Sequence, residues 1–303
     1  LVRALPGNVA QGIIWGIMAL GVYITFRILD FADLTVDGSL ATGGAVAVML
    51  IRGGMNPALA LLFAFLAGMA AGFVTGILHT FFGIPGILSS ILTQIGLYSV
   101  NLGIMGKSNQ AINVDKFDLL VSLRFIRKVP FYKNTILIVA IAIIVLIVVL
   151  YWFFGTELGC SLRATGCNDK MARAQGINTD FNRVLGLMIS NGLVALSGAM
   201  LCQYQGFADI NMGRGAIVIG LAAVIIGEAI FGKIFRNFGF KLLAVALGSI
   251  IYYLVMQVVL WLGLNSNDLK LLSALVVAVF LAIPYMKRKY FSKPVKKGGA
   301  RRA

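Results

Sequence analysis

Uncharged polar residues recur along one apolar stretch, 84–105, at intervals that a helix would align. Ser90, Gln94, Tyr98 and Asn101 are spaced four, four and three residues apart, with Thr93 beside them. This spacing places them on one helical face. Polar groups inside a membrane are costly, so such a stripe either lines a water-filled path or makes hydrogen bonds between packed helices. The sequence leaves both interpretations open.

A second polar segment precedes a short apolar run and supplies further candidates for a solute path. Asp33, Thr35, Asp37 and Ser39 are candidate route or gate residues, because they interrupt a membrane segment. Asp37 and Ser39 also suit the cap of a helix that starts at 39–40. We favour the cap for these two residues.

Catalysis on this chain is not expected. The single histidine, His79, supports neither a nucleophilic triad nor a metal cluster, and the three cysteines lack zinc-ligand spacing. Residues 106–108 (Gly-Lys-Ser) look like the end of a phosphate-binding loop, but Asn101 stands where that loop needs glycine. Glu228 is expected to form a structural ion pair with Lys233 rather than a proton relay. No metal or cofactor is predicted on this chain.

The elements that carry these residues are predicted to be membrane helices. At 59% hydrophobic residues in 303, the chain is too apolar for a soluble domain. Continuous apolar runs exclude a β-barrel, and the composition suffices for about nine helices in a lipid bilayer. The net charge of +15 lies at loop edges and in the tail, so no nucleic-acid partner is expected. Spans are predicted near 8–28, 39–52, 56–81, 84–105, 134–154, 183–204, 215–231, 241–263 and 270–287.

The order of the spans indicates two repeats of opposite topology within one domain, 1–303. In each half a long span is followed by a polar break (29–38 or 205–214), a short span and two long spans. Both breaks contain Phe-Ala-Asp. Interrupted inverted repeats are typical of transporters. The divisions are repeat one, 8–105; a connector span, 134–154; a cytoplasmic segment, 155–182; repeat two, 183–287; and a basic tail, 287–303.

Charge and glycine spacing predict how the helices are oriented and packed. The basic tail carries eight Lys/Arg and no acid, which favours a cytoplasmic C-terminus and, through nine spans, an external N-terminus. No cleavable signal is expected before the first span. The loop 106–133 is predicted to be external although it is rich in Lys and Arg, which are normally more frequent in cytoplasmic loops. Phe117, Leu120 and Leu123 suggest an interfacial helix in this loop. Glycines at four-residue spacing in 12–16 and 68–76 predict close helix packing.

The segment 157–177 is the most informative of those outside the spans. Asn168 suits an N-cap, Asp169 the first turn and Gly176 the C-terminal stop of a two-turn helix. Such a helix, joined to two spans, could transmit force from a docked protein. An idle loop is the alternative that the residues alone leave open.

Three segments resemble one transporter family. The run Leu162-Arg-Ala-Thr-Gly-Cys-Asn-x-x-Met-Ala-x-x-x-Gly-Ile177 resembles the coupling segment of permeases in the branched-chain amino acid and ribose ABC importer family. The segments 31–39 and 97–106 resemble the branch that is often linked to aromatic amino acids. The resemblance covers about 10–285. It implies a multi-pass protein of the bacterial inner membrane, organised as in type II importers.

The resemblance also implies partners and a coupling role. The expected partners are a second, identical permease copy, a cytosolic ABC ATPase dimer carrying ATP and Mg, and an extracytoplasmic substrate-binding protein. Glutamate at Arg163 and Ala172 is expected to disturb docking while the spans stay folded. Sugar or nucleoside import, an ion-coupled carrier and a membrane scaffold are the alternatives. The implied coupling residues are Leu162, Arg163, Ala164, Thr165, Gly166, Asn168, Met171, Ala172 and Gly176.

Overall fold

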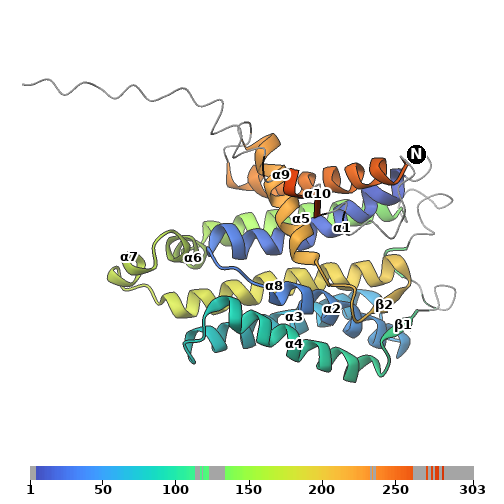
Figure 1. The fold of residues 1–303 in the computed structure, drawn as a ribbon, viewed down its shortest axis with the longest axis horizontal. Coiled ribbons are helices and arrows are strands. Elements are labelled where there is room, and N and C mark those ends of the chain that lie inside the picture. Colours follow the sequence, from blue (N-terminus) through green and yellow to red (C-terminus); the bar gives the residue numbers. More distant parts are fainter. Residues whose placement is uncertain are drawn as a thin grey trace, which may run out of the picture.

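The protein is a bundle of helices whose axes run roughly along its length (Figure 1). The structure is a computed structural model, and it describes residues 5–112, 117, 119–122, 134–232, 234, 237–261, 271, 274–275, 277–279 and 282. The long helices are α1 (Leu5–Tyr23), α2 (Thr35–Arg52), α3 (Pro57–Thr80), α4 (Gly86–Met105), α5 (Thr135–Gly155), α8 (Thr179–Gln205), α9 (Ala216–Phe231) and α10 (Phe238–Trp261). Six of the described helices are long and apolar enough to cross a membrane. The predicted all-α membrane fold is confirmed.

Helix α5 shows how composition and capping define a span. The side chain of Asn134 accepts a hydrogen bond from the amide of Ile136 and so caps the helix start. The following residues are almost all apolar, yet only one stripe, including Val139, Ile143 and Ile147, is buried. Apolar side chains on the opposite face, such as Ile144 and Val148, are exposed, as expected where lipid rather than water surrounds a helix.

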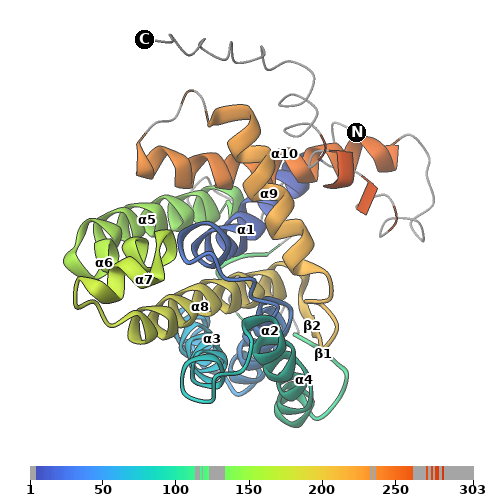
Figure 2. The same ribbon diagram turned by 60° about the vertical axis from the view of Figure 1, so that its left-hand side comes forward.

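The bundle contains two helix sets, each built from both halves of the sequence. Helix α8 packs mainly against α2 and α3, while α1 packs against α9 and α10 (Figure 2). The long first helix of each half therefore lies among the later helices of the other half. This exchange ties the two halves into one body.

Glycines allow these close contacts, as the spacing predicted. A Cβ added at Gly68 or Gly72 of α3 would overlap backbone oxygens of α8. A Cβ at Gly16 of α1 would lie 2.8 Å from Oγ of Ser249 in α10. Small residues let backbones approach where van der Waals contact, rather than water exclusion, must hold helices together.

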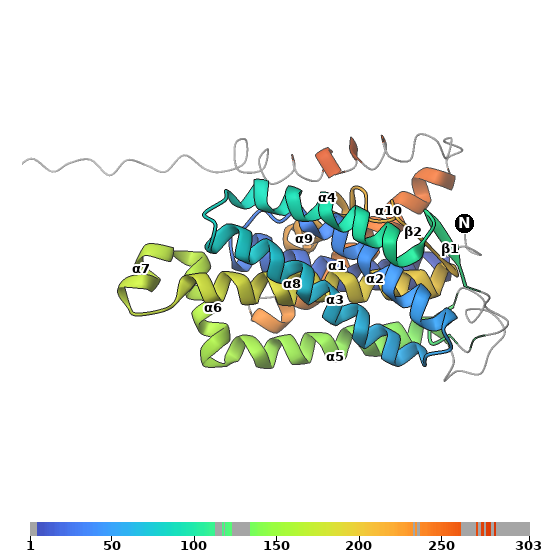
Figure 3. The same cartoon turned by 90° about the horizontal axis from the view of Figure 1, so that it is seen from below.

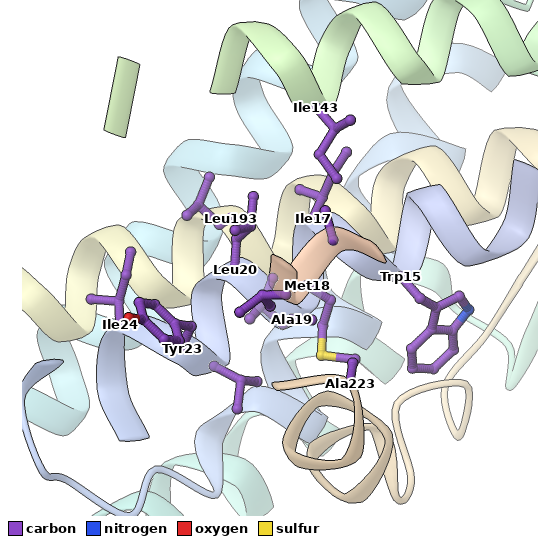
Figure 4. Close-up of a cluster of buried hydrophobic side chains, with 14 of the residues drawn as sticks. Trp15, Ile17, Met18, Ala19, Leu20, Tyr23, Ile24, Ile143, Leu193 and Ala223 are labelled. Carbon is purple, nitrogen blue, oxygen red and sulfur yellow. The ribbon is translucent and has the colours of Figure 1, made fainter. Parts of the chain in front are cut away.

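Helix α1 lies at the centre of the bundle. Its side chains Ile17, Met18 and Leu20 are fully buried, and α5, α8 and α9 surround them through residues such as Ile143 and Leu193 (Figure 4). After Tyr23 the helix continues as a π turn, Ile24–Ile28, in which the amide of Leu29 bonds to the carbonyl of Ile24. The chain then runs without helix to Thr35.

Two predictions about local structure are wrong, one on the start of a helix and one on the presence of a helix. Helix α2 begins at Thr35 rather than at 39–40, because Asp33 accepts a hydrogen bond from the amide of Thr35 and starts the helix earlier. Residues 119–122 form bends rather than the predicted interfacial helix; the amide of Leu120 bonds to Oε1 of Gln203. The rest of that predicted helix, and most of the span 270–287, lie outside the described residues.

The two ends of the bundle carry different structures. At one end α6 (Glu157–Cys167) and α7 (Asp169–Ala174) extend beyond the long helices (Figure 3). At the other end β1 (Asn109–Ala111) pairs antiparallel with β2 (Phe207–Asp209). The predicted topology makes the first end cytoplasmic and the second external.

Candidate functional site

A hollow of about 330 Å³ lies between α2, α4 and the turn that precedes α9. Ligand pockets in proteins usually measure roughly 300–1,000 Å³, so this hollow is large enough for a small solute. Its lining is mixed, with two charged side chains, several polar ones and a few apolar ones. The lining residues are Asp37, Gly38, Ala41, Gln94, Ile95, Tyr98, Ser99, Asn101, Ile210 and Arg214.

The polar stripe of α4 divides between this hollow and the helix packing. Gln94, Tyr98 and Asn101 line the hollow. Ser90 and Thr93 are buried, and their hydroxyls donate to carbonyls of α4 itself, those of Ile87 and Ser89. The half of the stripe nearer the external end can therefore contact a solute in the hollow, and the other half satisfies itself within the helix.

Asn101 is the most unusual member of the stripe. It is 1% exposed, and its Nδ2 lies 3.5 Å from the carbonyl oxygen of Gly38. Its Oδ1 is buried without a hydrogen-bond partner among the described residues. A buried acceptor without a donor costs free energy, so this atom calls for an explanation.

Asp37 caps a helix, but not the one that the sequence suggested. It lies in the first turn of α2, and its carboxylate oxygens accept hydrogen bonds from the amides of Gly215 and Ile217, at 2.9 and 3.0 Å. These amides start α9, which has no side-chain cap of its own. Asp37 thus joins the first helix set to the second at the wall of the hollow, where the positive end of the α9 dipole faces its charge.

The other candidate gate residues near the first break lie inside the helix packing. Asn191 of α8 donates to Oδ2 of Asp33 at 2.7 Å, and Ser39 donates to Oδ1 of Asn191 at 2.6 Å. The hydroxyls of Thr35 and Thr75 are 2.8 Å apart. Asp33, Thr35 and Ser39 are at most 2% exposed, and none of them lines the hollow. The predicted caps at Asp37 and Ser39 for a helix starting at 39–40 are wrong.

The sequence reading missed Arg214. This exposed side chain lines the hollow and also a second hollow of about 560 Å³ between α1, α9 and α10, whose walls include Trp15, Tyr253 and Gln257. No acidic side chain of the described residues forms an ion pair with Arg214. The sequence did offer a signal for Arg214, because it lies directly before a short span. A cation at a helix start interacts unfavourably with the helix dipole, so its presence there calls for an explanation.

At the end of the bundle opposite the two β-strands, the predicted two-turn helix is present as α7. The side chain of Asn168 accepts a hydrogen bond from the amide of Met171, and Gly176 has a φ of +81°, as the predicted cap and stop require. The sequence reading missed α6, which precedes it. Thr156 caps α6 by accepting from the amide of Gly159.

Helices α6 and α7 are fixed firmly to the long helices. Nδ2 of Asn182 in α8 donates to Oγ of Ser161 and to Oγ1 of Thr165 in α6, at 2.6 and 2.9 Å. A Cβ at Gly166 would overlap the carbonyl oxygen of Ile28, the last residue of the π turn. Movement of α6 toward the π turn would therefore displace Ile28.

The residues predicted to couple the permease to an ATPase differ in accessibility. Leu162, Thr165 and Ala172 are buried, so glutamate at Ala172 would disturb the fold, which corrects the expectation that it would not. Arg163 lies half-buried over the ring of Phe238, at 5.7 Å from its centroid. Ala164 and Gly166 are half-buried. The exposed positions are Asn168, Met171 (63% exposed) and Gly176.

Glu228 forms an ion pair, with Arg27 of the π turn as its partner. Nε of Arg27 lies 2.8 Å from Oε1 of Glu228. Lys233, the partner predicted from the sequence, lies outside the described residues. The described part of the chain shows no cluster of three metal-ligating side chains.

Comparison with known proteins gives a consistent result. Residues 7–284 match the family described as branched-chain amino acid transport system / permease component. A tyrosine transport system permease protein from Clostridioides difficile is 42% identical over 90% of this chain and 88% of its own length. The autoinducer 2 import system permease protein LsrC of Yersinia pestis is 32% identical over 64% of this chain and 54% of its own length.

A solved structure shares the fold. PsaBC from Streptococcus pneumoniae, determined in complex with Fab, superposes with a TM-score of 0.51 at 18% identity, covering 94% of both chains. At this identity the likeness concerns the fold alone.

Proposed function

Because the chain belongs to the branched-chain amino acid transport permease family, we propose that this bacterial inner-membrane subunit of an ABC importer carries an amino acid. A permease of this family is a transport protein and not an enzyme. ATP, with Mg, is bound and hydrolysed by a separate cytosolic ATPase. An extracytoplasmic binding protein delivers the solute.

The fixed protrusion of α6 and α7 carries the proposal. It joins α5 to α8, contacts the end of α1 through Gly166, and presents Met171 to the outside. An ion-coupled carrier has no need of such a rigid docking element, whereas an ATP-driven permease must receive force at its cytoplasmic end.

The substrate class rests on the relatives. A protein 42% identical over most of both chains is named for tyrosine transport, which favours an amino acid, in particular an aromatic one. The more distant relative named for autoinducer 2 import makes a sugar-like solute the second candidate. Uptake of labelled L-tyrosine and of ribose by the reconstituted complex separates the two.

Docking is tested by Met171→Glu, with Met171→Leu as the matched control. The glutamate places a charge on the exposed face of α7 without entering the core, so we expect the permease to fold but to lose ATPase co-purification and at least tenfold in uptake. The leucine variant should behave as the unmodified protein. Full uptake by Met171→Glu would contradict the assignment of α7 as the docking helix.

We further propose that two identical copies pair about a two-fold axis. One chain offers one α7, and ABC ATPases act as dimers, so two permease copies match two ATPase subunits. Native mass spectrometry of the purified complex should give two permease chains. A mass with a single permease chain would contradict this pairing.

A further inference from the structure

The hollow between α2 and α4 has the properties of a built binding site. It joins three segments that are far apart in sequence, namely the start of α2, the outer half of α4 and the turn before α9. One side chain of its wall, Asn101, is buried, and its Oδ1 lacks a donor among the described residues. The wall therefore contains a polar group that the described packing does not satisfy.

The hollow contains one charge of each sign, and neither is neutralised by an ion pair among the described residues. The oxygens of Asp37 each accept one amide hydrogen bond from α9. The amide of Ala216 also contacts this carboxylate, which offers about four acceptor sites, so at least one site remains for a ligand. Arg214 is exposed and presents a guanidinium, which binds a carboxylate through two parallel hydrogen bonds.

On the basis of the function proposed above, we infer that this hollow contacts the charged backbone groups of an amino acid solute. Arg214 binds the α-carboxylate, and Asp37 accepts from the α-ammonium group. Tyr98, which is 44% exposed, provides an aromatic wall for the side chain. A sugar carries no charged groups, so it would not form ion pairs with both Arg214 and Asp37.

Occupancy of the hollow is measured by cysteine protection in the complete reconstituted transporter. Ser99→Cys places a thiol in the wall, and Ser108→Cys places one at the same end outside the hollow. The exposed Cys160 and Cys167 are replaced by serine in both variants. We expect L-tyrosine to slow modification of Ser99→Cys by a charged thiol reagent and to leave Ser108→Cys unaffected.

The chemical class is tested with analogues that lack one charge. Tyramine has no carboxylate and 3-(4-hydroxyphenyl)propanoate has no ammonium group, so each should protect Ser99→Cys at least tenfold more weakly than L-tyrosine. In the same background, Arg214→Gln should weaken protection by L-tyrosine about tenfold to a hundredfold, the effect of losing a charge-assisted pair. Lys107→Gln removes an equal charge from an exposed position outside the hollow and should change nothing.

The outcomes separate this inference from the proposed function. Equal protection by all three compounds, protection by ribose alone, or an Arg214→Gln variant that behaves as its parent would overturn the inference. L-tyrosine uptake without any protection of Ser99→Cys would show that the hollow does not contact the solute, while the importer function stands. Absence of ATP-dependent uptake of every solute would instead refute the proposed function.

Discussion

The two polar breaks of this chain share a sequence and one local hydrogen bond but differ in environment. In the first, Asp33 accepts a hydrogen bond from the amide two residues on, that of Thr35, at 2.9 Å. In the second, Asp209 does the same with Asn211, at 2.7 Å. The aspartate that ends Phe-Ala-Asp thus makes the same side-chain-to-backbone bond twice, although 207–209 form strand β2 and 31–33 do not form a strand. However, Asp33 is 2% exposed and contacts Asn191 of α8, whereas Asp209 is half-buried in the β2 strand.

The difference shows that one motif can fix the start of the following helix at one site and not at the other. Helix α2 begins directly after the first turn, locked by Asn191. Helix α9 begins seven residues after Asp209 and takes its cap from Asp37 of the other half. The first break is therefore internal structure, and the second contributes Arg214 to the hollow.

The largest expected difference is between Asp33→Ala and Asp209→Ala. The first leaves the amide of Thr35 without its acceptor and leaves Nδ2 of Asn191 with only the carbonyl of Leu187, so we expect a loss of about 2–5 kcal/mol in the free energy of unfolding. The second loses two partly exposed hydrogen bonds, from the amide of Asn211 and the side chain of Asn109, which together should cost about 0.5–1.5 kcal/mol. Thermal unfolding of both variants in detergent provides the measurement. Equal losses would mean that burial does not distinguish the two breaks.

A second comparison concerns the contact between the coupling segment and the chain just before the first break. Gly166→Ala forces α6 away from the carbonyl of Ile28 and should cost about 1–3 kcal/mol, with reduced uptake per ATP hydrolysed. Gly103→Ala, in α4 with open space around it, should be neutral or stabilising by up to about 1 kcal/mol. Unimpaired coupling in Gly166→Ala would show that this contact transmits no movement.

The link between the breaks is tested at Asp37. Asp37→Ala removes the cap of α9 and should cost about 0.5–2 kcal/mol, while Asp37→Asn keeps one acceptor and should lose less. Hydrogen exchange of the amides of Gly215 and Ile217 should quicken most in the alanine variant. Unchanged exchange in both variants would rule out a capping role.

The smallest effect is expected at the ion pair between Arg27 and Glu228. The two side chains are 53% and 30% exposed, so Glu228→Gln should cost only about 0.2–1 kcal/mol. The cost should shrink as salt is raised, because screening weakens exposed pairs. Unfolding at low and high ionic strength checks this. A large, salt-independent loss would indicate a buried role for Glu228.

Local patterns predicted much of the fold and part of the site. Most described span limits lie within a few residues of prediction, and Asn168 and Gly176 define α7 because caps are local signals. The pairing of Glu228 with Arg27 joins positions 201 residues apart, which no local pattern encodes. Likewise the burial of Ala172 depends on tertiary packing.

The π turn at Ile24–Ile28 changes the direction, about the axis of α1, in which the following chain leaves the helix. A π turn amounts to one residue inserted into an α-helix, and one residue corresponds to about 100° of rotation. Everything that follows α1, including the Phe-Ala-Asp turn, is therefore offset by roughly that angle from the face that α1 would have continued. Removing a single residue from this turn would restore a regular α-helix and rotate the first break away from α8. The π turn therefore determines which direction the first break faces.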